Sequence, residues 1–279
     1  MKQGLIVIAA IVFLVLGVIA WILYDTGRVP LTEEPVAVEV APAAVQPSEP
    51  EPKAEEFMVS EKRDVPVTEL EEIPLPPLYQ SDSYLEGKLA DVVGEESVEQ
   101  FFVTDALAAR TVATVDALGG RQVPGNLRVM TGPAGEFKAM RDPDPPLEIL
   151  DEAGDPLPQY LSSTANEERF LPFVELLESI DVEKAAAEYR RHYPLFQEAW
   201  REQGYTDSDF DQRLKAVIDE LLATPEAAEP YRLVKPEAVY LFVDPELENL
   251  SGGQKILLRM GSDNAARVKS WLAKLRQAI

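Results

Sequence analysis

The sequence contains no cysteine and a single histidine, His192. Without cysteine the chain can form no disulfide and carries no thiolate nucleophile. Zinc sites need several His or Cys ligands, and a hydrolytic triad needs a nucleophile partnered with its base, so one histidine supports neither. We therefore interpret His192 as an ordinary side chain in a helix, and we predict neither a metal site nor a bound cofactor.

Basic residues are also scarce. The 279 residues include 26 Lys and Arg against 49 Asp and Glu, which gives a formal net charge of −23. Nucleic-acid binding relies on clustered Lys and Arg that displace counterions from phosphates, so this balance argues against a nucleic-acid partner. The same excess of acid disfavours docking of the soluble part on anionic lipid. Solubility and self-repulsion explain the charge without a specific function.

A phosphate-binding loop of the form G-x-x-x-x-G-K-[ST] is missing as well. Its absence matters because residues 250–254 read Leu-Ser-Gly-Gly-Gln, the signature of the ABC-transporter ATPases. An apolar run that ends in Asp244 precedes this signature, which reverses the order in that family. Without a loop to cradle phosphates a nucleotide has no site, so we predict none. We interpret Ser251 as the N-cap of a helix whose first turn the glycines ease.

A long apolar run stands near the start of the chain. Residues 5–24 carry no charge and end in Trp21 and Tyr24. A helix of this length, at about 1.5 Å per residue, spans roughly the 30 Å of a bilayer's hydrocarbon core. We therefore predict a transmembrane helix. A cleaved signal sequence is the alternative, because Lys2 forms a short basic start and Ala20 suits a peptidase, but the run exceeds the usual apolar length of about 7–15 residues.

Charge predicts the orientation of this helix. Lys2 lies before the apolar run, whereas the residues after Arg28 are rich in Glu. The positive-inside rule then places residues 1–4 in the cytoplasm and the bulk of the chain across the membrane. In a bacterium that side is the periplasm. We accordingly predict a single-pass protein of the bacterial inner membrane with a periplasmic C-terminal domain.

Residues 25–77 differ in composition from what precedes and follows them, because Pro and Glu are frequent there. Pro interrupts helices and sheets and like charges repel, so we expect an extended, disordered linker. In polyproline II geometry it reaches at most ~150 Å, and as a flexible coil about 40 Å. The segment is either a spacer or a simple tether. Phe57, Met58 and Val59 form a lone apolar cluster that is a candidate docking peptide.

Residues 78–279 follow mainly helical patterns, with Gly or Pro at the breaks, and predict one mainly α, bundle-like domain. In residues 121–161 the apolar residues do not recur with the periodicity of a helix. Short apolar pieces there, at 136–140 and 147–150, suit a small hairpin or an irregular insertion. The helices are expected near residues 82–93, 95–118, 170–180, 181–203, 207–223, 237–249 with a break near 244–245, 254–260 and 262–279. The expected N-caps are Ser81 or Asp82, Thr206 or Asp207, Ser251 and Ser262, and Pro194 should kink or restart its helix.

Several short motifs in this domain resemble those of a known family. They are Leu-Leu-Glu-Ser at 176–179, Tyr-Pro-Leu at 193–195, Leu-Leu-Ala-Thr-Pro at 221–225, Asp-Pro-Glu-Leu at 244–247 and Leu-Arg-Met-Gly at 258–261. In these motifs the chain is similar to the domain-of-unknown-function family DUF3014 of bacterial envelope proteins. The resemblance implies a location and an architecture, namely an N-terminal hydrophobic segment, a Pro-rich spacer and this domain. It implies no activity and no functional residue.

Two further motifs have both a functional and a structural interpretation. Glu178-Ser179 matches the Glu-Ser pair of lytic transglycosylases and goose-type lysozymes, in which one acid with a raised pKa protonates a glycosidic oxygen. The match is short, and the Gly-Leu-Met-Gln-like segment of those enzymes is missing, so a cell-wall hydrolase that uses Glu178 is the alternative function. The alternating acids of residues 207–211 resemble a calcium loop. However, Gln212 and Ile218 replace its required Gly and Glu, and helix capping explains the acids more simply.

The residues that best suit a binding site lie in the helix expected over residues 181–203. They are Tyr189, Arg190, Arg191, Tyr193 and Gln197. Tyr and Arg are favoured at interface hot spots, and here they bring local positive charge to an acidic protein. The structural alternative is that the tyrosines belong to the core and the arginines pair with Glu along the helix. Our hypothesis is a membrane-tethered protein whose domain binds an unidentified envelope protein without catalysis.

Overall fold

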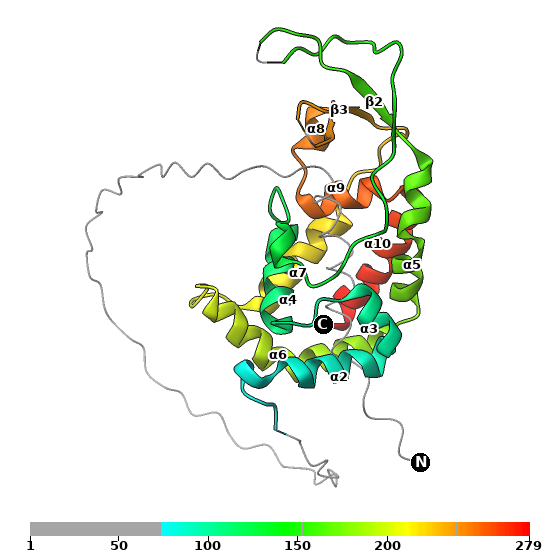
Figure 1. Ribbon diagram of the computed structural model, residues 1–279. Coiled ribbons are helices and arrows are strands. Elements are labelled where there is room, and N and C mark those ends of the chain that lie inside the picture. Colours follow the sequence, from blue (N-terminus) through cyan, green and yellow to red (C-terminus); the bar gives the residue numbers. More distant parts are fainter. Residues whose placement is uncertain (1–73, 152, 238) are drawn as a thin grey trace, which may run out of the picture. The chain divides into compact units, whose positions relative to one another are not determined.

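The computed structural model describes residues 74–151, 153–237 and 239–279. Over these residues the protein is mainly helical, as the sequence predicts, and a small antiparallel sheet completes it (Figure 1). The predicted transmembrane helix at residues 5–24 lies outside the described residues, as do the candidate docking peptide and most of the predicted linker. Among the helices of the described part, none combines the length and the apolar character needed to cross a membrane.

Nine α-helices make up most of the described part. Their bounds are α2 Asp82–Val93, α3 Glu95–Phe101, α4 Leu107–Leu118, α5 Glu167–Glu178, α6 Val182–Glu202, α7 Phe210–Leu222, α8 Pro245–Glu248, α9 Gly252–Arg259 and α10 Ser262–Ala278. Short 3-10 turns occur at Leu78–Gln80, Gly125–Leu127 and Thr164–Asn166.

Apolar stripes at helical spacing bring these helices together around one main core. Helix α4 packs against α6 and α7, and α10 packs against α5, α6 and α7. Phe170, Phe196 and Phe210, from three different helices, are fully buried at the centre of this arrangement. The sequence places six apolar residues of α7 on its inner face. Five of them are buried, and the sixth, Leu222, is half-buried; the buried ones are Phe210, Leu214, Val217, Ile218 and Leu221.

The single helix predicted over residues 95–118 is wrong, because the chain forms α3 and α4 with a short extended stretch between them. Phe102, which follows α3 in an extended conformation, pairs in an isolated bridge with Met130. Ala106, which precedes α4, adopts a left-handed conformation with φ 52°. Its N–H donates to Asp82 of α2 over 2.9 Å. Backbone and side-chain partners from elsewhere in the chain therefore interrupt a stretch whose local pattern is helical.

Helix α6 continues through Pro194, so of the two predicted outcomes the restart is wrong, while the kink stays a prediction. Its bounds, Val182–Glu202, enclose the proline without a break. A proline removes the N–H that would bond to the carbonyl four residues earlier, here that of Arg190. Both residues are exposed, so water can bond to that carbonyl instead. Solvent access explains why this proline is tolerated.

Two of the predicted N-caps are also wrong. Helix α7 is capped by the side chain of Asp209, which lies two residues beyond the predicted Asp207 and three beyond Thr206. Ser262 is the first residue of α10 and makes no side-chain cap. Its N–H instead donates to the carboxylate of Glu229 over 2.9 Å. The start of α10 is therefore stabilised by a residue 33 positions earlier in the chain.

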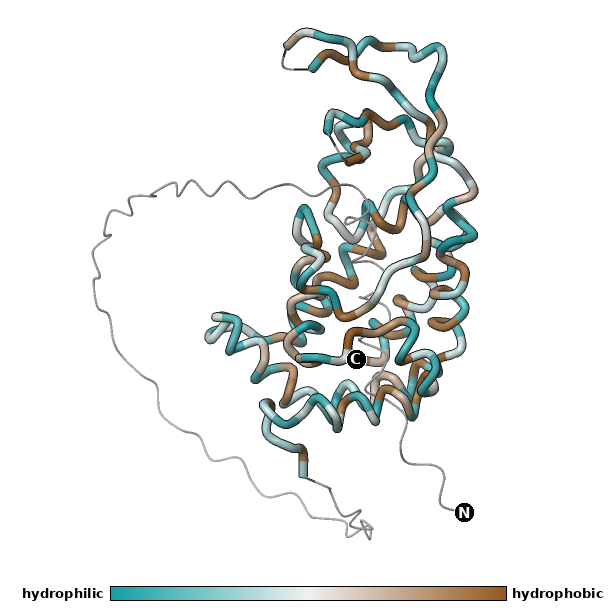
Figure 2. Tube along the Cα trace, viewed as in Figure 1, coloured by the Kyte–Doolittle hydropathy of each residue, from teal (hydrophilic) through white to brown (hydrophobic). Residues whose placement is uncertain are grey.

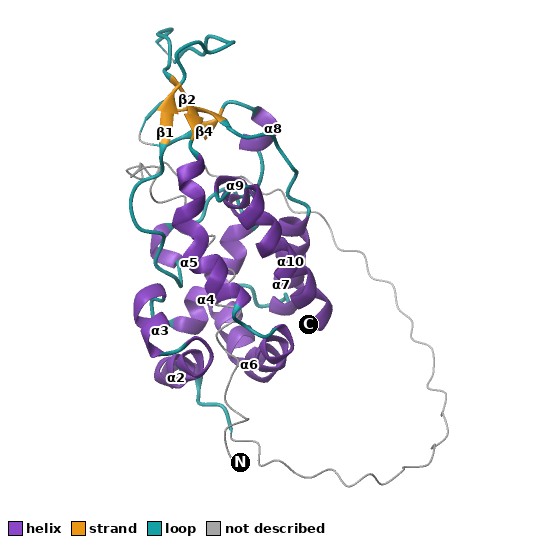
Figure 3. Ribbon diagram, turned by 90° about the vertical axis from the view of Figure 1, so that its right-hand side faces the viewer, coloured by secondary structure: helices purple, strands orange, loops and turns teal. Residues whose placement is uncertain are grey.

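The strands form one antiparallel sheet in the order β1-β2-β3-β4. In this register Met140 lies opposite Leu161, and Leu233 lies opposite both Tyr160 and Phe242. Figure 3 shows the sheet at one end of the helical body. An apolar cluster supports it, formed by Phe137, Tyr231, Leu233, Phe242 and Leu258 of α9. The strands are β1 Ala139–Arg141, β2 Gln159–Ser162, β3 Arg232–Val234 and β4 Leu241–Phe242.

The predicted hairpin is present, but its strands differ from the predicted ones. The strand β1 pairs with β2 at residues 159–162 rather than with the apolar piece at 147–150. The helix predicted over residues 237–249 is wrong in its first half, because residues 241 and 242 form β4. Helix α8 begins only at Pro245, after the side chain of Asp244 accepts a hydrogen bond as its N-cap. Proline favours this first helical position because it has no N–H to leave unpaired.

Candidate functional site

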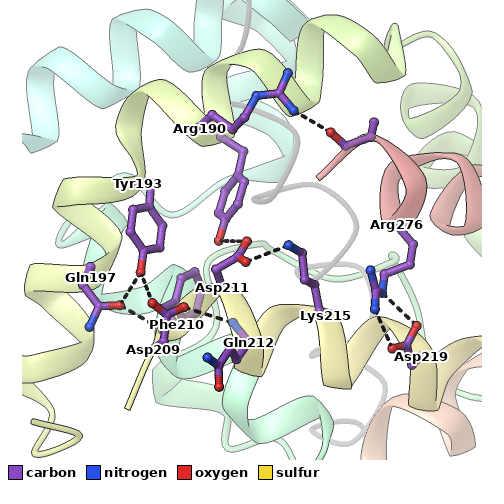
Figure 4. A network of polar contacts seen from close by, with 12 residues as sticks. Arg190, Tyr193, Gln197, Asp209, Phe210, Asp211, Gln212, Lys215, Asp219 and Arg276 are labelled. Carbon is purple, nitrogen blue, oxygen red and sulfur yellow. Dashed lines mark hydrogen bonds and ion pairs between the residues drawn. The ribbon is translucent and has the colours of Figure 1, made fainter. Parts of the chain in front are cut away.

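Three of the five residues of the predicted binding cluster join α6 to the start of α7 (Figure 4). The Tyr193 hydroxyl lies 2.7 Å from Asp209 Oδ2 and 2.9 Å from Gln197 Oε1. Gln197 Oε1 also accepts the N–H of Phe210 over 2.8 Å. The Tyr189 hydroxyl donates to Asp211 over 3.2 Å. These contacts connect a buried face of α6 to the N-terminal turn of α7.

Burial determines the protonation of these phenols. Tyr189 is only 2% exposed, and burial raises its pKa, with the nearby carboxylate of Asp211 acting in the same direction. Burial and the hydrogen bond to Asp209 raise the pKa of Tyr193 likewise. Both phenols therefore stay protonated and act as hydrogen-bond donors to the carboxylates of α7.

The two arginines of the cluster are exposed and lie apart from this network. Arg190 donates to the backbone carbonyl of Ala278 at the end of α10 (Figure 4). The charge of Arg191 acts on Glu188 and His192, whose pKa values are shifted mainly by burial. The binding role of the cluster stays a prediction. The structure gives Tyr189, Tyr193, Gln197 and Arg190 a role within the fold.

His192 connects α6 to α2 at a fully buried position with no solvent exposure. Its Nε2 lies 3.1 Å from the Tyr84 hydroxyl, and its Nδ1 lies 3.0 Å from the backbone oxygen of Glu188. The Glu188 carboxylate is also near, 3.3 Å from Nδ1. Burial lowers the pKa of His192 to about 4 and raises that of Glu188. The imidazole is therefore neutral near pH 7, and its contacts are hydrogen bonds rather than an ion pair.

The sequence contains one signal that His192 is buried, beyond its being an ordinary side chain in a helix. The residue lies three positions after Tyr189 and four before Phe196, which places all three on one face of the helix. Tyr189 and Phe196 are both buried. A histidine on such a face must be desolvated, and it then needs hydrogen-bond partners for both ring nitrogens.

Glu178, the candidate acid of the alternative function, lies at the end of α5. Its two carboxylate oxygens face the guanidinium of Arg267 on α10, at 3.0 Å and 2.6 Å. The hydrogen bonds from Arg267 lower the pKa of Glu178 below its ordinary value. A general acid needs the opposite, a pKa raised toward the working pH. The arrangement favours a surface ion pair between two helices.

The Leu-Ser-Gly-Gly-Gln segment forms the start of α9. Ser251 and Gln254 make a reciprocal capping box, with both N–H to side-chain distances 3.3 Å, so the predicted N-cap is confirmed. Gly253 also has a packing role that the sequence does not indicate. A Cβ on Gly253 would lie 2.5 Å from Leu221 Cδ2 and 3.1 Å from the Leu118 carbonyl oxygen. Close approach of α9 to α4 and α7 therefore requires the glycine.

An open groove of about 640 Å³ runs along α4. Its floor is a row of alanines at 106, 109, 113 and 117, and Tyr205 stands at its side. Asp116 at its edge accepts hydrogen bonds from Arg213 over 2.7 Å and from the Tyr205 hydroxyl over 2.8 Å. The Tyr205 ring stacks on Trp200 at 3.7 Å. The groove thus has an apolar floor, and the side chains of Asp116 and Tyr205 at its edge are already paired.

These features define a mainly helical domain whose candidate reactive groups serve the packing of its helices. The chain belongs to the family described as Protein of unknown function (DUF3014), which matches residues 107–276. The resemblance predicted from the sequence motifs is thereby confirmed. The match begins at the start of α4 and ends in α10, so α2 and α3 precede it. No curated protein matches the chain, and no solved structure does.

Proposed function

We propose that the protein is a single-pass, membrane-tethered periplasmic protein whose helical domain binds another protein of the cell envelope without catalysing a reaction. Residues 5–24 would anchor it in the inner membrane, and residues 25–77 would hold the domain away from the bilayer. The uncharged run, the Pro- and Glu-rich composition and the charge bias around the run support this arrangement.

One observation supports binding over catalysis: the groups best suited to acid–base chemistry are engaged in contacts between helices of the domain. Glu178 is paired with Arg267, which lowers its pKa. His192 is buried against Tyr84 and Glu188, and its pKa is lowered to about 4. Catalytic acids and bases are instead poised near the working pH and within reach of a substrate.

Crosslinking in cells followed by mass spectrometry tests the binding role. The full chain, tagged at its C-terminus, is compared with a tagged chain that ends at residue 77 and so carries the anchor and linker alone. We expect an envelope protein to be enriched with the full chain and absent from the shorter one. Identical protein lists from the two chains would refute the proposal, because the domain would then add no partner.

The location is tested separately with a reporter fused after Ile279. An enzyme that is active only in the periplasm should give signal, and one that is active only in the cytoplasm should not. The opposite result would place the domain on the cytoplasmic side and contradict the proposed topology.

The competing function is a cell-wall hydrolase in which Glu178 is the acid. The Arg267 ion pair weighs against it, because it stabilises the ionised form of Glu178. The decisive comparison is release of soluble muropeptides from purified peptidoglycan by the full chain and by its Glu178→Gln variant. We expect no release from either. Release by the wild type that the variant loses would overturn the non-catalytic proposal.

A further inference from the structure

The connection between β1 and β2 extends beyond the sheet and away from the helices, as Figures 1 and 3 both show. We call residues 139–162, which comprise the two strands and this connection, the acidic arm. The whole arm lies within the residues that match the family.

Backbone hydrogen bonds and one capped turn order the arm. Leu157 N–H donates to Ile149 O over 2.7 Å, and Asp151 N–H donates to Asp155 O over 2.9 Å. At the tip Asp151 Oδ1 accepts the N–H groups of Ala153 and Asp155, each over 2.9 Å. The arm is thus a defined hairpin although its connection has no apolar core of its own.

At its base the arm is attached to the sheet by an ion pair. Asp142, which is buried, pairs with Arg232 of β3, and its N–H donates to Gln159 O over 2.9 Å. A partner bound to the connection would therefore be held in a fixed position relative to the sheet.

Exposed apolar side chains gather on this arm. In the part of the chain that the structure describes, five large apolar or aromatic residues are exposed, and three of them belong to the arm. These are Met140, Leu147 and Leu150, at 61%, 65% and 52% exposure. Figure 2 shows apolar residues interspersed with hydrophilic ones along the connection. Single exposed apolar residues are common on protein surfaces, but such a grouping on one projecting hairpin favours an interaction site.

The connection between the two strands of the arm carries only acidic charge, whereas Arg141 lies at its base in β1. Residues 142–158 contain six Asp and Glu and no Lys or Arg. Asp142 is already paired with Arg232, whereas Asp144 and Glu148 are exposed beside Leu147. A second copy of this chain, with its net charge of −23, would be repelled, and an anionic bilayer would be repelled as well. Charge complementarity therefore favours a partner rich in Lys and Arg.

We propose that the acidic arm docks a basic, apolar segment of a partner protein. Leu147 and Leu150 contact the apolar side chains of that segment, and Asp144 and Glu148 hold its Lys or Arg residues. This inference rests on the proposed binding function and adds to it the surface and the chemistry of the partner. The α4 groove carries no such argument, because nothing on its floor indicates what covers it.

The test uses the full chain in cells, with a photoreactive amino acid at position 147 or 150. A photoreactive residue at Tyr79, which is exposed but lies off the arm, is the control position. We expect crosslinks from 147 and 150 to a protein segment that carries Lys or Arg among apolar residues, and none to that segment from position 79.

Matched charge reversals make the test specific. Asp144→Lys with Glu148→Lys should lower the crosslink yield about tenfold, because two attractive pairs become repulsive. Glu86→Lys with Glu99→Lys makes the same charge change at exposed positions of α2 and α3, and should leave the yield within about twofold. Equal circular dichroism spectra and unfolding midpoints of the purified variants would show that folding is intact.

In the crosslinking experiment, the inference is overturned by crosslinks to a second copy of this chain, to lipid or to an acidic segment, or by no crosslink from the arm. In the charge-reversal experiment, it is overturned if the two double variants change the crosslink yield equally. If the arm gives no crosslink while the tagged full chain still enriches a partner, the binding function stands and the arm is not its site. If neither experiment yields a partner, the proposed function itself is wrong.

Discussion

Lowering the pH should weaken the attachment of α2 to α6, because His192 must then take up a proton at a fully buried site. The ring is fully buried and bonded to Tyr84 of α2. The charged groups near it are Lys88 and Asp91 of α2 and Glu188 and Arg191 of α6. The nearby cations add to burial in opposing protonation of the ring. The folded state therefore resists a proton that the unfolded chain accepts.

The magnitude follows from the two pKa values. His192 titrates at about 4 in the folded state and near 6.5 when it is solvated. A difference of that size corresponds to about 3 kcal/mol of folding free energy. The unfolded chain binds more protons between these values, so this contribution is fully present above pH ~6.5 and is lost as the pH falls through about 4. Glu188 acts in the opposite sense, because its raised pKa favours proton uptake by the folded state.

Urea unfolding of the full chain at pH 7.5 and at pH 4.5, followed by circular dichroism, measures this effect. His192→Gln is the comparison, because its amide can donate and accept hydrogen bonds but cannot take up a proton. We expect the wild type to lose about 2 kcal/mol more stability than the variant between the two pH values. Equal losses of stability in the two proteins would refute the reasoning. A larger loss in the variant would mean that protonation of His192 stabilises the folded state.

The remaining predictions concern stability, each measured by the same unfolding assay at pH 7.5. Gly253→Ala should lower the free energy of unfolding by about 1–3 kcal/mol, because its new Cβ meets a backbone oxygen. Gly87→Ala is the control, since its Cβ meets nothing within 4 Å, and it should stabilise α2 by about 0.5–1 kcal/mol. A gain from both would contradict the packing argument. Asp82→Ala should cost about 1 kcal/mol by uncapping α4, and Asp82→Asn less. Glu178→Gln should cost under about 1 kcal/mol, because its ion pair is exposed.

The candidate sites show where residue patterns are informative about function and where they are not. Tyr189 and Tyr193 are typical of a binding surface in sequence, but their hydroxyls face the carboxylates at the start of α7. Those carboxylates, Asp211 and Asp209, are themselves part of what resembles a calcium loop. The tyrosine cluster and the calcium-loop-like acids, which are separate patterns in the sequence, thus form the two halves of one hydrogen-bond network between α6 and α7. Only their pairing across the fold reveals this.

The sequence by itself determined the features that depend on neighbours within a few residues. The apolar stripe of α7 and the capping box between Ser251 and Gln254 are examples, as are the ends of α4 at Gly119 and of α2 at Gly94. Their partners lie within one or two helical turns, so spacing alone specifies them. The mainly helical character of the described domain follows from the same local rules.

Only the tertiary structure decided the features whose partner lies far along the chain. Asp82 looks like a cap for its own helix, yet its carboxylate accepts the first N–H groups of α4, and Glu229 does the same for α10. Residues 241–242 are a strand only because β3 lies beside them to complete their hydrogen bonds. A carboxylate or a backbone N–H takes whichever partner the packing of the core brings within reach. Local spacing does not encode that choice, and the folded chain alone makes it.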